Sequence, residues 1–165
     1  MPAVLTNGFN HVAVLTADSE RLHAFYEEVF EATVARDGPE PGATAAVRLS
    51  IVRLGPSSEL NVFEIEGNHE AERQTPMFGR GRIDHLALQA DSLEAFETIR
   101  DRLMARGATD GFVTDFGPAL SVFFRDPDGL ECEVCIDNPD ARPGVANPPG
   151  TPSPRYQVGV PSHAR

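Results

Sequence analysis

The chain contains two copies of one pattern, and this duplication restricts its possible folds more than any other feature. The segment "FNHVAVLTADSERLHAFYEEVF" begins at Phe9, and "IDHLALQADSLEAFETIRDRL" begins at Ile83. Each copy starts with a short apolar run that carries a histidine at its third residue. Each then reaches Asp-Ser, which is typical of a helix start. Chance rarely reproduces a motif order of this length, so we expect two related halves.

A helix is predicted after each Asp-Ser. Apolar residues of the first copy recur at helical spacing and form one stripe. They are Leu22, Phe25, Tyr26, Val29 and Phe30. The second copy has a looser stripe of Leu93, Phe96, Ile99 and Leu103. Its Asp91 and Glu94 have the spacing of a capping box, and Gly107 is well placed to end the helix.

Strand-like runs follow both helices. In the first half they are "TVAR", "AAVRLSIVRL" and "LNVFEI", separated by runs rich in Gly and Pro. In the second half they are "GFVTDF", "LSVFFR" and "LECEVCI", and the Pro-Asp-Gly turn predicts a hairpin between the last two. Each half therefore has the order strand, helix, strand, strand, strand.

These elements predict an α+β protein of two βαβββ modules that form a curled mixed sheet, with the helices on its outer face and a cup inside. We place the first module at residues 1–65, a polar linker at 66–82 and the second module at 83–137. Residues 138–165 are predicted to be a Pro-rich extended tail that adds little core, because seven of the 14 prolines lie in 137–165. The tail could also wrap over the body or over a partner subunit.

Composition excludes several classes of function. The net charge of −11 argues against binding to nucleic acid or to an anionic membrane. All 14 basic residues are arginine, so this sequence offers no lysine for a Schiff base or a phosphate loop. No apolar run reaches the length of a membrane span, and no signal peptide is evident at Met1, so a cytoplasmic protein is expected.

Cys132 and Cys135 have CxxC spacing, but they lie in a predicted strand. Residues three apart in a strand point to opposite faces, roughly 10 Å apart. A disulfide needs Cα atoms within about 7 Å. We therefore expect small buried side chains rather than a redox pair or a zinc site.

Strand alternation predicts which side chains face the cup. The helix side should receive Leu60 and Val62, then Val47, Leu49 and Ile51, and finally Leu130, Cys132, Val134 and Ile136. The cup side should receive Asn61, Phe63, Ile65, Arg48, Ser50, Glu131, Glu133 and Cys135. Of these, we assign Arg48, Ser50, Phe63 and Glu131 to a substrate pocket, with Arg48 as a candidate partner for an anionic group.

The repeat also predicts a metal site. His11 and His85 occupy matching places on the first strands, and Asn61 and Glu133 occupy matching places on the last strands. A pseudo-two-fold axis between the halves would bring these four positions together. Two imidazoles and one carboxylate with open positions form a facial triad for a divalent transition metal, such as Fe, Mn, Ni or Zn. Glu133 is then both a ligand and the candidate catalytic residue, and Asn61 is a weak ligand or a partner of a ligand.

The other histidines and acidic residues are predicted to lie outside the metal site. His23, His69 and His163 have no matched counterpart, and we expect them at the surface. Glu131 is expected nearer the rim of the cup, and it would replace Glu133 if the strand register differed by two residues. Asp84 is expected to point to the opposite face from His85 and to be structural.

The quoted repeats, together with "FFRDPDGLECEV", resemble the vicinal oxygen chelate superfamily over roughly residues 7–137. That group includes glyoxalase I, extradiol dioxygenases, bleomycin and fosfomycin resistance proteins and methylmalonyl-CoA epimerase. The resemblance implies paired modules around a metal cup, a small-molecule substrate that chelates the metal, and a homodimer. It carries the metal ligands over to His11, His85 and Glu133.

One position departs from the glyoxalase pattern. Asn61 stands where glyoxalase-like members usually have Glu, and an amide cannot accept a proton near neutral pH. A dioxygenase and a lyase or isomerase both remain open. The alternatives are a metal-free drug-sequestering protein of the bleomycin-resistance type, and a structural or regulatory protein that uses the Pro-rich tail.

Overall fold

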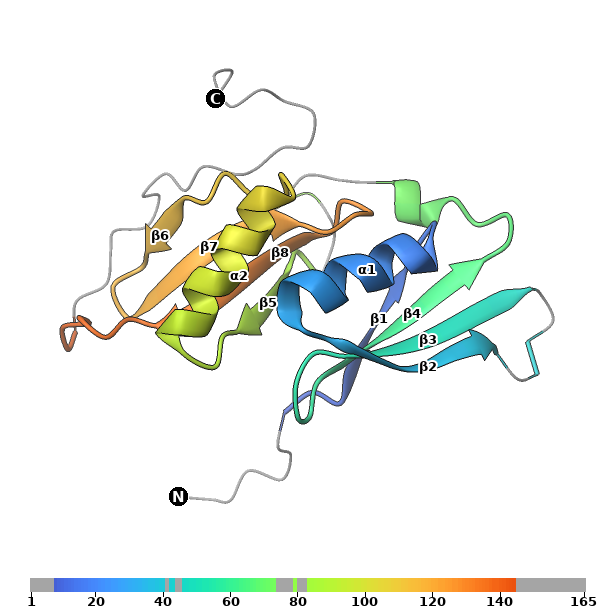
Figure 1. Cartoon of the computed structure of the whole chain (residues 1–165), viewed down its shortest axis with the longest axis horizontal. Helices are drawn as coiled ribbons and strands as arrows, with labels where there is room; N and C mark the ends of the chain where they lie inside the picture. The colour runs from blue at the N-terminus through green and yellow to red at the C-terminus, as the bar shows by residue number, and fades with distance from the viewer. Residues whose placement is uncertain (1–7, 41, 44–45, 74–78, 80–82, 145–165) are drawn as a thin grey trace. The chain divides into compact units, whose positions relative to one another are not determined.

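The computed structural model describes residues 8–40, 42–43, 46–73, 79 and 83–144 (Figure 1). The chain divides into two compact units, Met1–Arg73 and Gln74–Arg165, and each is described by itself below. The tail beyond residue 144, with the predicted surface residue His163, lies outside the described residues.

The first unit is a four-stranded mixed sheet with one long helix across it. Its elements are β1 (His11–Leu15), α1 (Ser19–Phe30), β2 (Thr33–Pro39), β3 (Val47–Arg53) and β4 (Glu59–Ile65), followed by the short 3-10 helix η1 (Glu70–Glu72). The strand order is β1-β4-β3-β2, in which β1 runs parallel to β4 and the other neighbours are antiparallel.

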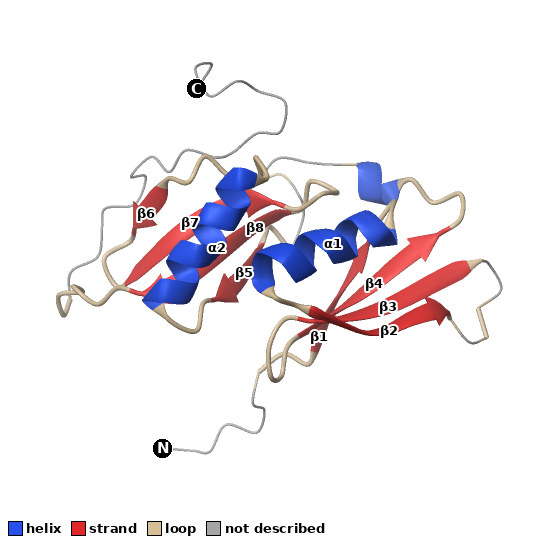
Figure 2. Ribbon diagram, viewed as in Figure 1, coloured by secondary structure: helices blue, strands red, loops and turns tan. Residues whose placement is uncertain are grey.

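The second unit repeats this plan. Its elements are β5 (Leu86–Gln89), α2 (Leu93–Ala105), β6 (Val113–Asp115), β7 (Ala119–Arg125) and β8 (Glu131–Asp137). The strand order β5-β8-β7-β6 matches that of the first unit, and β5 is parallel to β8 (Figure 2). The predicted α+β class with two βαβββ modules is confirmed, and neither sheet closes into a barrel.

The starts of both helices and the end of α2 have reasons visible in the sequence. The Asp18 side chain caps α1 by accepting a hydrogen bond from the Arg21 backbone N–H at 2.9 Å. In α2 the cap is Ser92, which accepts from the Ala95 N–H at 3.1 Å, so the predicted cap at Asp91 was wrong by one residue. Gly107 follows the last turn of α2 with φ of +65°, a conformation that favours glycine.

The helix-covered face of each sheet forms its core. Leu60 and Val62 of β4 are 1% and 0% exposed, and Cys132 and Val134 of β8 are 0% and 1% exposed. The alternation predicted for these two strands is therefore confirmed. No disulfide joins Cys132 and Cys135.

The turn before β8 is held by one buried carboxylate. Asp126 accepts hydrogen bonds from the backbone N–H groups of Asp128 (3.0 Å) and Leu130 (2.8 Å). Burial raises the pKa of Asp126 to about 7 despite these bonds. The predicted Pro-Asp-Gly hairpin thus enters β8 with a fixed register, in which Arg125 lies opposite Glu131.

Neither α1 nor α2 has the length and hydrophobicity that a bilayer-spanning helix needs, and the rest of the described chain offers no other candidate.

Candidate metal centre

Two of the three predicted metal ligands lie together in the second unit. His85 directly precedes β5, and β5 runs beside β8 with Ala87 opposite Glu133. The His85 Nε2 atom is 3.3 Å from Glu133 Oε2. A nitrogen and an oxygen that bind one ion through bonds of ~2.1 Å are separated by ~3.0–3.4 Å. The pair therefore has the spacing of neighbouring ligands on a divalent metal.

The imidazole of His85 is held by the residue before it. The Asp84 carboxylate oxygen Oδ2 is 2.8 Å from His85 Nδ1. An ionised carboxylate only accepts hydrogen bonds, so this contact suits a proton on Nδ1, while Nε2 faces a second carboxylate, that of Glu133. Metal-binding histidines are commonly held in this way by an oxygen on the ring nitrogen that does not bind the metal.

The first unit contains the same arrangement. Asn10 Oδ1 lies 2.8 Å from the Nδ1 atom of His11, so the side chain before this histidine also contacts Nδ1. The prediction that Asp84 is turned away from its histidine was wrong, because its side chain contacts the ring. An oxygen-bearing side chain before each repeated histidine was visible in the sequence and could have revealed both contacts.

Glu133 lies in a nearly closed environment. Its exposed fraction is 8%, its Oε1 atom accepts a hydrogen bond from the Ser121 hydroxyl, and the Phe123 ring packs edge-on against His85. Burial, together with the charge of Glu133, raises the pKa of the Cys135 thiol to about 12. This part of the second sheet therefore combines one carboxylate with neutral donors and an aromatic wall.

Glu131, two residues away, has a different partner. Arg125 binds its Oε1 at 3.1 Å through Nε and at 2.5 Å through a terminal nitrogen, and Glu131 is only 4% exposed. Glu131 is thus buried and paired rather than placed at an open rim. The first unit repeats this ion pair as Arg53 and Glu59, at 3.0 Å.

The repeated ion pairs define which positions of the two units correspond. Counting two residues onward from Glu59 and Glu131 makes Asn61 equivalent to Glu133, as the sequence predicted. Asn61 is half-buried on β4, opposite Ala13 of β1 and Ile51 of β3. His11 is exposed, and Phe63 lies on the same face of the sheet as Asn61, away from α1.

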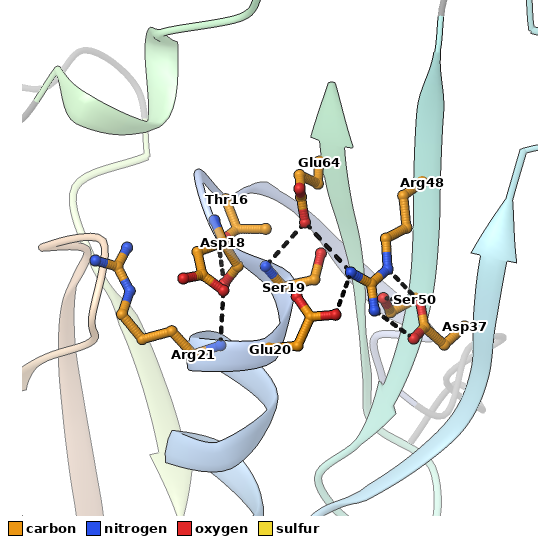
Figure 3. A network of polar contacts seen from close by, with 9 residues as sticks. All are labelled: Thr16, Asp18, Ser19, Glu20, Arg21, Asp37, Arg48, Ser50 and Glu64. Atoms are coloured by element: carbon orange, nitrogen blue, oxygen red, sulfur yellow. Dashed lines mark hydrogen bonds and ion pairs between the residues drawn. The ribbon is translucent and has the colours of Figure 1, made fainter. Parts of the chain in front are cut away.

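Arg48 and Ser50 lie on the other face, and their predicted place in the cup was wrong. Ser50 pairs with Val62 across the sheet and is fully buried, and Arg48 reaches Glu20 of α1 at 2.7 Å (Figure 3). The sequence predicted that these two residues face the cup because their side chains are polar. A charge can face the helix here because Arg48 also binds both carboxylate oxygens of Asp37, at 2.7 and 2.6 Å.

Arg48 also lines a cavity of about 800 Å³ in the first unit, next to Asp37 and Glu64. Its guanidinium is already engaged, because it binds Asp37 and Glu20 directly and lies 3.7 Å from Glu64. Further lining carboxylates come from Glu40, Glu66 and Glu72. This acidic lining does not suit an anionic substrate group, so the geometry gives Arg48 a structural role.

The Arg48 network should make stability depend on pH. The hydrogen bonds from Arg48 lower the pKa of Asp37 from 3.8 to about 2. A depressed carboxyl pKa stabilises the fold above pH ~4, and this stabilisation is lost as the pH falls toward 2. We expect Arg48→Met to lower the free energy of unfolding by about 1 kcal/mol at pH 7, since both side chains remain about one-third exposed.

Urea unfolding of Arg48→Met and of the parent at several pH values measures this difference. The two proteins should converge only below pH 2, because Asp37 of the parent is half protonated at its pKa of about 2. Arg73→Met is the matched control, because Arg73 pairs with Glu70 at a largely exposed site. An equal loss in both variants, or a loss that does not change with pH, would contradict the role given to Asp37.

The remaining histidines differ from one another. His69 is exposed, with 76% of its side chain in solvent, as predicted. His23 was predicted at the surface, but it lies on the buried side of α1 with an exposed fraction of 8%. Its place on the helix puts it one residue beyond Leu22, within the buried stripe.

Across the part of the chain that the structure describes, no three His, Cys, Asp or Glu side chains form a group that could hold a metal ion. The second unit supplies the pair His85 and Glu133, and His11 and Asn61 belong to the first unit. The pair fits a metal in spacing and donor type, and a third ligand must come from elsewhere.

These features agree with the comparisons with known proteins. The family model of the Glyoxalase/Bleomycin resistance protein/Dioxygenase superfamily matches residues 8–134, and the chain belongs to this superfamily. A 2-epi-5-epi-valiolone epimerase from Actinomyces sp is 29% identical over 141 residues, which span 76% of this chain and 76% of that protein.

Solved structures show the same fold. A glyoxylase/bleomycin resistance protein/dioxygenase domain from Frankia sp. EAN1pec has a TM-score of 0.66 at 20% identity, covering 82% of this chain and 95% of that one. The fosfomycin resistance protein FosX from Listeria monocytogenes, solved with Mn(II) and sulfate, has a TM-score of 0.59 at 17% identity, covering 84% and 98%.

Proposed function

We propose that this chain is a divalent-metal-dependent enzyme that acts on a small oxygenated molecule, with His11, His85 and Glu133 as the metal ligands. The observation that carries the proposal is the repeated contact of Asn10 with His11 and of Asp84 with His85, each at 2.8 Å. Metal-binding histidines commonly have an oxygen in contact with the ring nitrogen that does not bind the metal. The same contact on Nδ1 at matched positions of both units therefore supports both histidines as metal ligands.

Each residue of such a site would have its own role. Both histidines offer Nε2, and Glu133 offers Oε2, which lies beside His85 Nε2. A metal bound by these atoms would polarise an oxygen of the substrate and favour charge development there. Asn61 offers a neutral carbonyl oxygen where a carboxylate would add negative charge.

Among reaction classes, we favour an isomerase or epimerase that moves a proton at carbon. The epimerase relative supports this choice. Glu131 on the same face of β8, and its counterpart Glu59 in the first unit, each pair with an arginine. Glu133 instead contacts the uncharged Ser121 and the His85 ring. Glu133 is therefore the carboxylate best placed to accept or hold a proton. A small-molecule substrate, a homodimer and a cytoplasmic location complete the proposal.

Metal-loaded protein in D₂O tests the reaction class. After anaerobic reconstitution with Fe, Mn, Ni or Zn, we expect deuterium to enter small hydroxycarbonyl compounds at the carbon next to the carbonyl, as read by NMR. The exchange should stop when a chelator is added. Oxygen uptake with catechols and no exchange would instead indicate a dioxygenase.

The metal-free, drug-sequestering alternative predicts a different result on metal analysis. It would be supported if purified protein held less than a tenth of an equivalent of metal and its melting temperature did not rise on metal addition. Binding of a small molecule by such metal-free protein would then replace the enzyme proposal.

A further inference from the structure

The hydroxyl of Ser121 divides the two oxygens of Glu133 between separate partners. Ser121 lies on β7, is fully buried, and donates its hydrogen bond to Oε1. The other oxygen, Oε2, faces His85 Nε2. Because a carboxylate oxygen engaged by a close donor is less available to a cation, Ser121 leaves Oε2 as the atom that can bind a metal.

The equivalent place in the first unit is apolar. The ion pairs Arg53–Glu59 and Arg125–Glu131 align β3 with β7, and this alignment puts Leu49 at the position of Ser121. Leu49 lies opposite Phe63, whereas Ser121 lies opposite Cys135. The fold therefore does not require a hydroxyl at this point of the strand. A hydroxyl occurs in the unit that has Glu133 and is missing from the unit that has Asn61.

Burial makes the hydroxyl important to the carboxylate. Glu133 has little contact with water, so an ionised side chain there depends on hydrogen bonds from the protein. Without Ser121, Oε1 would lose the hydroxyl donor, and the weaker donor that remains beside Glu133 is the Cys135 thiol. Loss of such a supporting partner typically costs 10–100-fold in metal affinity.

We propose that Ser121 is a positioning residue for Glu133: it fixes Oε1 so that Glu133 binds the metal through Oε2 alone. This inference rests on the proposed metal site. It goes beyond that site by naming the residue that sets the orientation and the one-oxygen binding mode of the carboxylate.

The test compares two variants of nearly equal shape. Ser121→Thr keeps a hydroxyl, whereas Ser121→Val replaces it with a methyl group. The dissociation constant of Co²⁺ is measured by competition with a chromophoric chelator, and the free energy of unfolding is measured in urea without metal. We expect Ser121→Thr to bind Co²⁺ nearly as tightly as the parent, and Ser121→Val to bind about 10–100-fold more weakly.

Ser50→Ala is the matched control for the loss of a buried serine hydroxyl that bonds a carboxylate. Ser50 is also fully buried on the central strand of its sheet and also bonds a carboxylate, that of Asp37 at 3.2 Å, but on the helix-covered face. Its Co²⁺ affinity should equal that of the parent. Equal Co²⁺ affinity of Ser121→Thr and Ser121→Val, with the parent binding well, would overturn the role of Ser121.

His85→Ala separates this result from a failure of the site itself. If His85→Ala binds Co²⁺ like the parent, the proposed metal site is wrong and the positioning role falls with it. If His85→Ala loses Co²⁺ while the valine and threonine variants agree, the site stands and only the role of Ser121 is overturned.

Discussion

Replacing His85 with alanine is expected to weaken divalent-metal binding by about 100-fold or more, because a ligand is lost outright rather than a supporting contact. His85 has its Nε2 atom 3.3 Å from Glu133 Oε2 and its Nδ1 atom held by Asp84. Removing the ring takes away the nitrogen ligand that lies between the carboxylates of Asp84 and Glu133. Metal affinity, measured with a chromophoric chelator, reports the change directly.

His69→Ala is the control for this variant. His69 is exposed and contacts Glu72 at 3.4 Å, so it resembles His85 in having a carboxylate partner but lacks a buried neighbour such as Glu133. Its removal should leave metal affinity unchanged. If both variants lost affinity equally, metal would be binding to surface histidines, and the assignment of His85 would be wrong.

The second large effect concerns the core beneath α2. Phe96 is 1% exposed, and Phe96→Ala should lower the free energy of unfolding by about 3–5 kcal/mol, through lost burial and the cavity left behind. The loss corresponds to a shift of about two to four orders of magnitude in the folding equilibrium, and urea unfolding of the full chain measures it.

Leu93→Ala provides a control in the same helix. The sequence placed Leu93 in the apolar stripe with Phe96, but Leu93 is the first residue of α2 and is 45% exposed. We expect it to change the free energy of unfolding by less than about 0.5 kcal/mol. Similar losses for Leu93→Ala and Phe96→Ala would show that the helix packs on a different face.

The duplication allowed most of the fold to be predicted. A repeated strand, Asp-Ser helix start and hairpin leave few ways to build a sheet, and alternation correctly assigned the faces of β4 and β8. These strands could be assigned because the helix-facing residues at their centres are apolar. Cys132 and Val134 in β8 are examples.

Alternation failed in β3, where polarity and burial do not coincide. Val47, Leu49 and Ile51 are apolar, yet they lie on the same face as Asn61, while Arg48 and Ser50 lie under α1. The charge of Arg48 is compensated by carboxylates from β2 and α1 that are distant in sequence. A single strand carries no sign of such partners, so its pattern alone indicated the wrong face.

The candidate site was predicted in part for a similar reason. The repeat predicted His85 and Glu133 as ligands, and the structure places the two side chains together. The partners that contact them come from different strands or were misread. Asp84 adjoins His85, and its role follows only when Asn10 before His11 is seen as its counterpart. Ser121 is 12 residues from Glu133, and only the pairing of β7 with β8 brings them together.

We propose that His11, His85 and Glu133 bind one ion. Pulsed electron paramagnetic resonance of the protein loaded with one equivalent of Cu²⁺ tests it most directly, since modulation from the remote ring nitrogen counts the bound imidazoles. We predict two imidazoles in the parent and one in each of His11→Ala and His85→Ala. Two imidazoles remaining in either variant, or one in the parent, would contradict the claim.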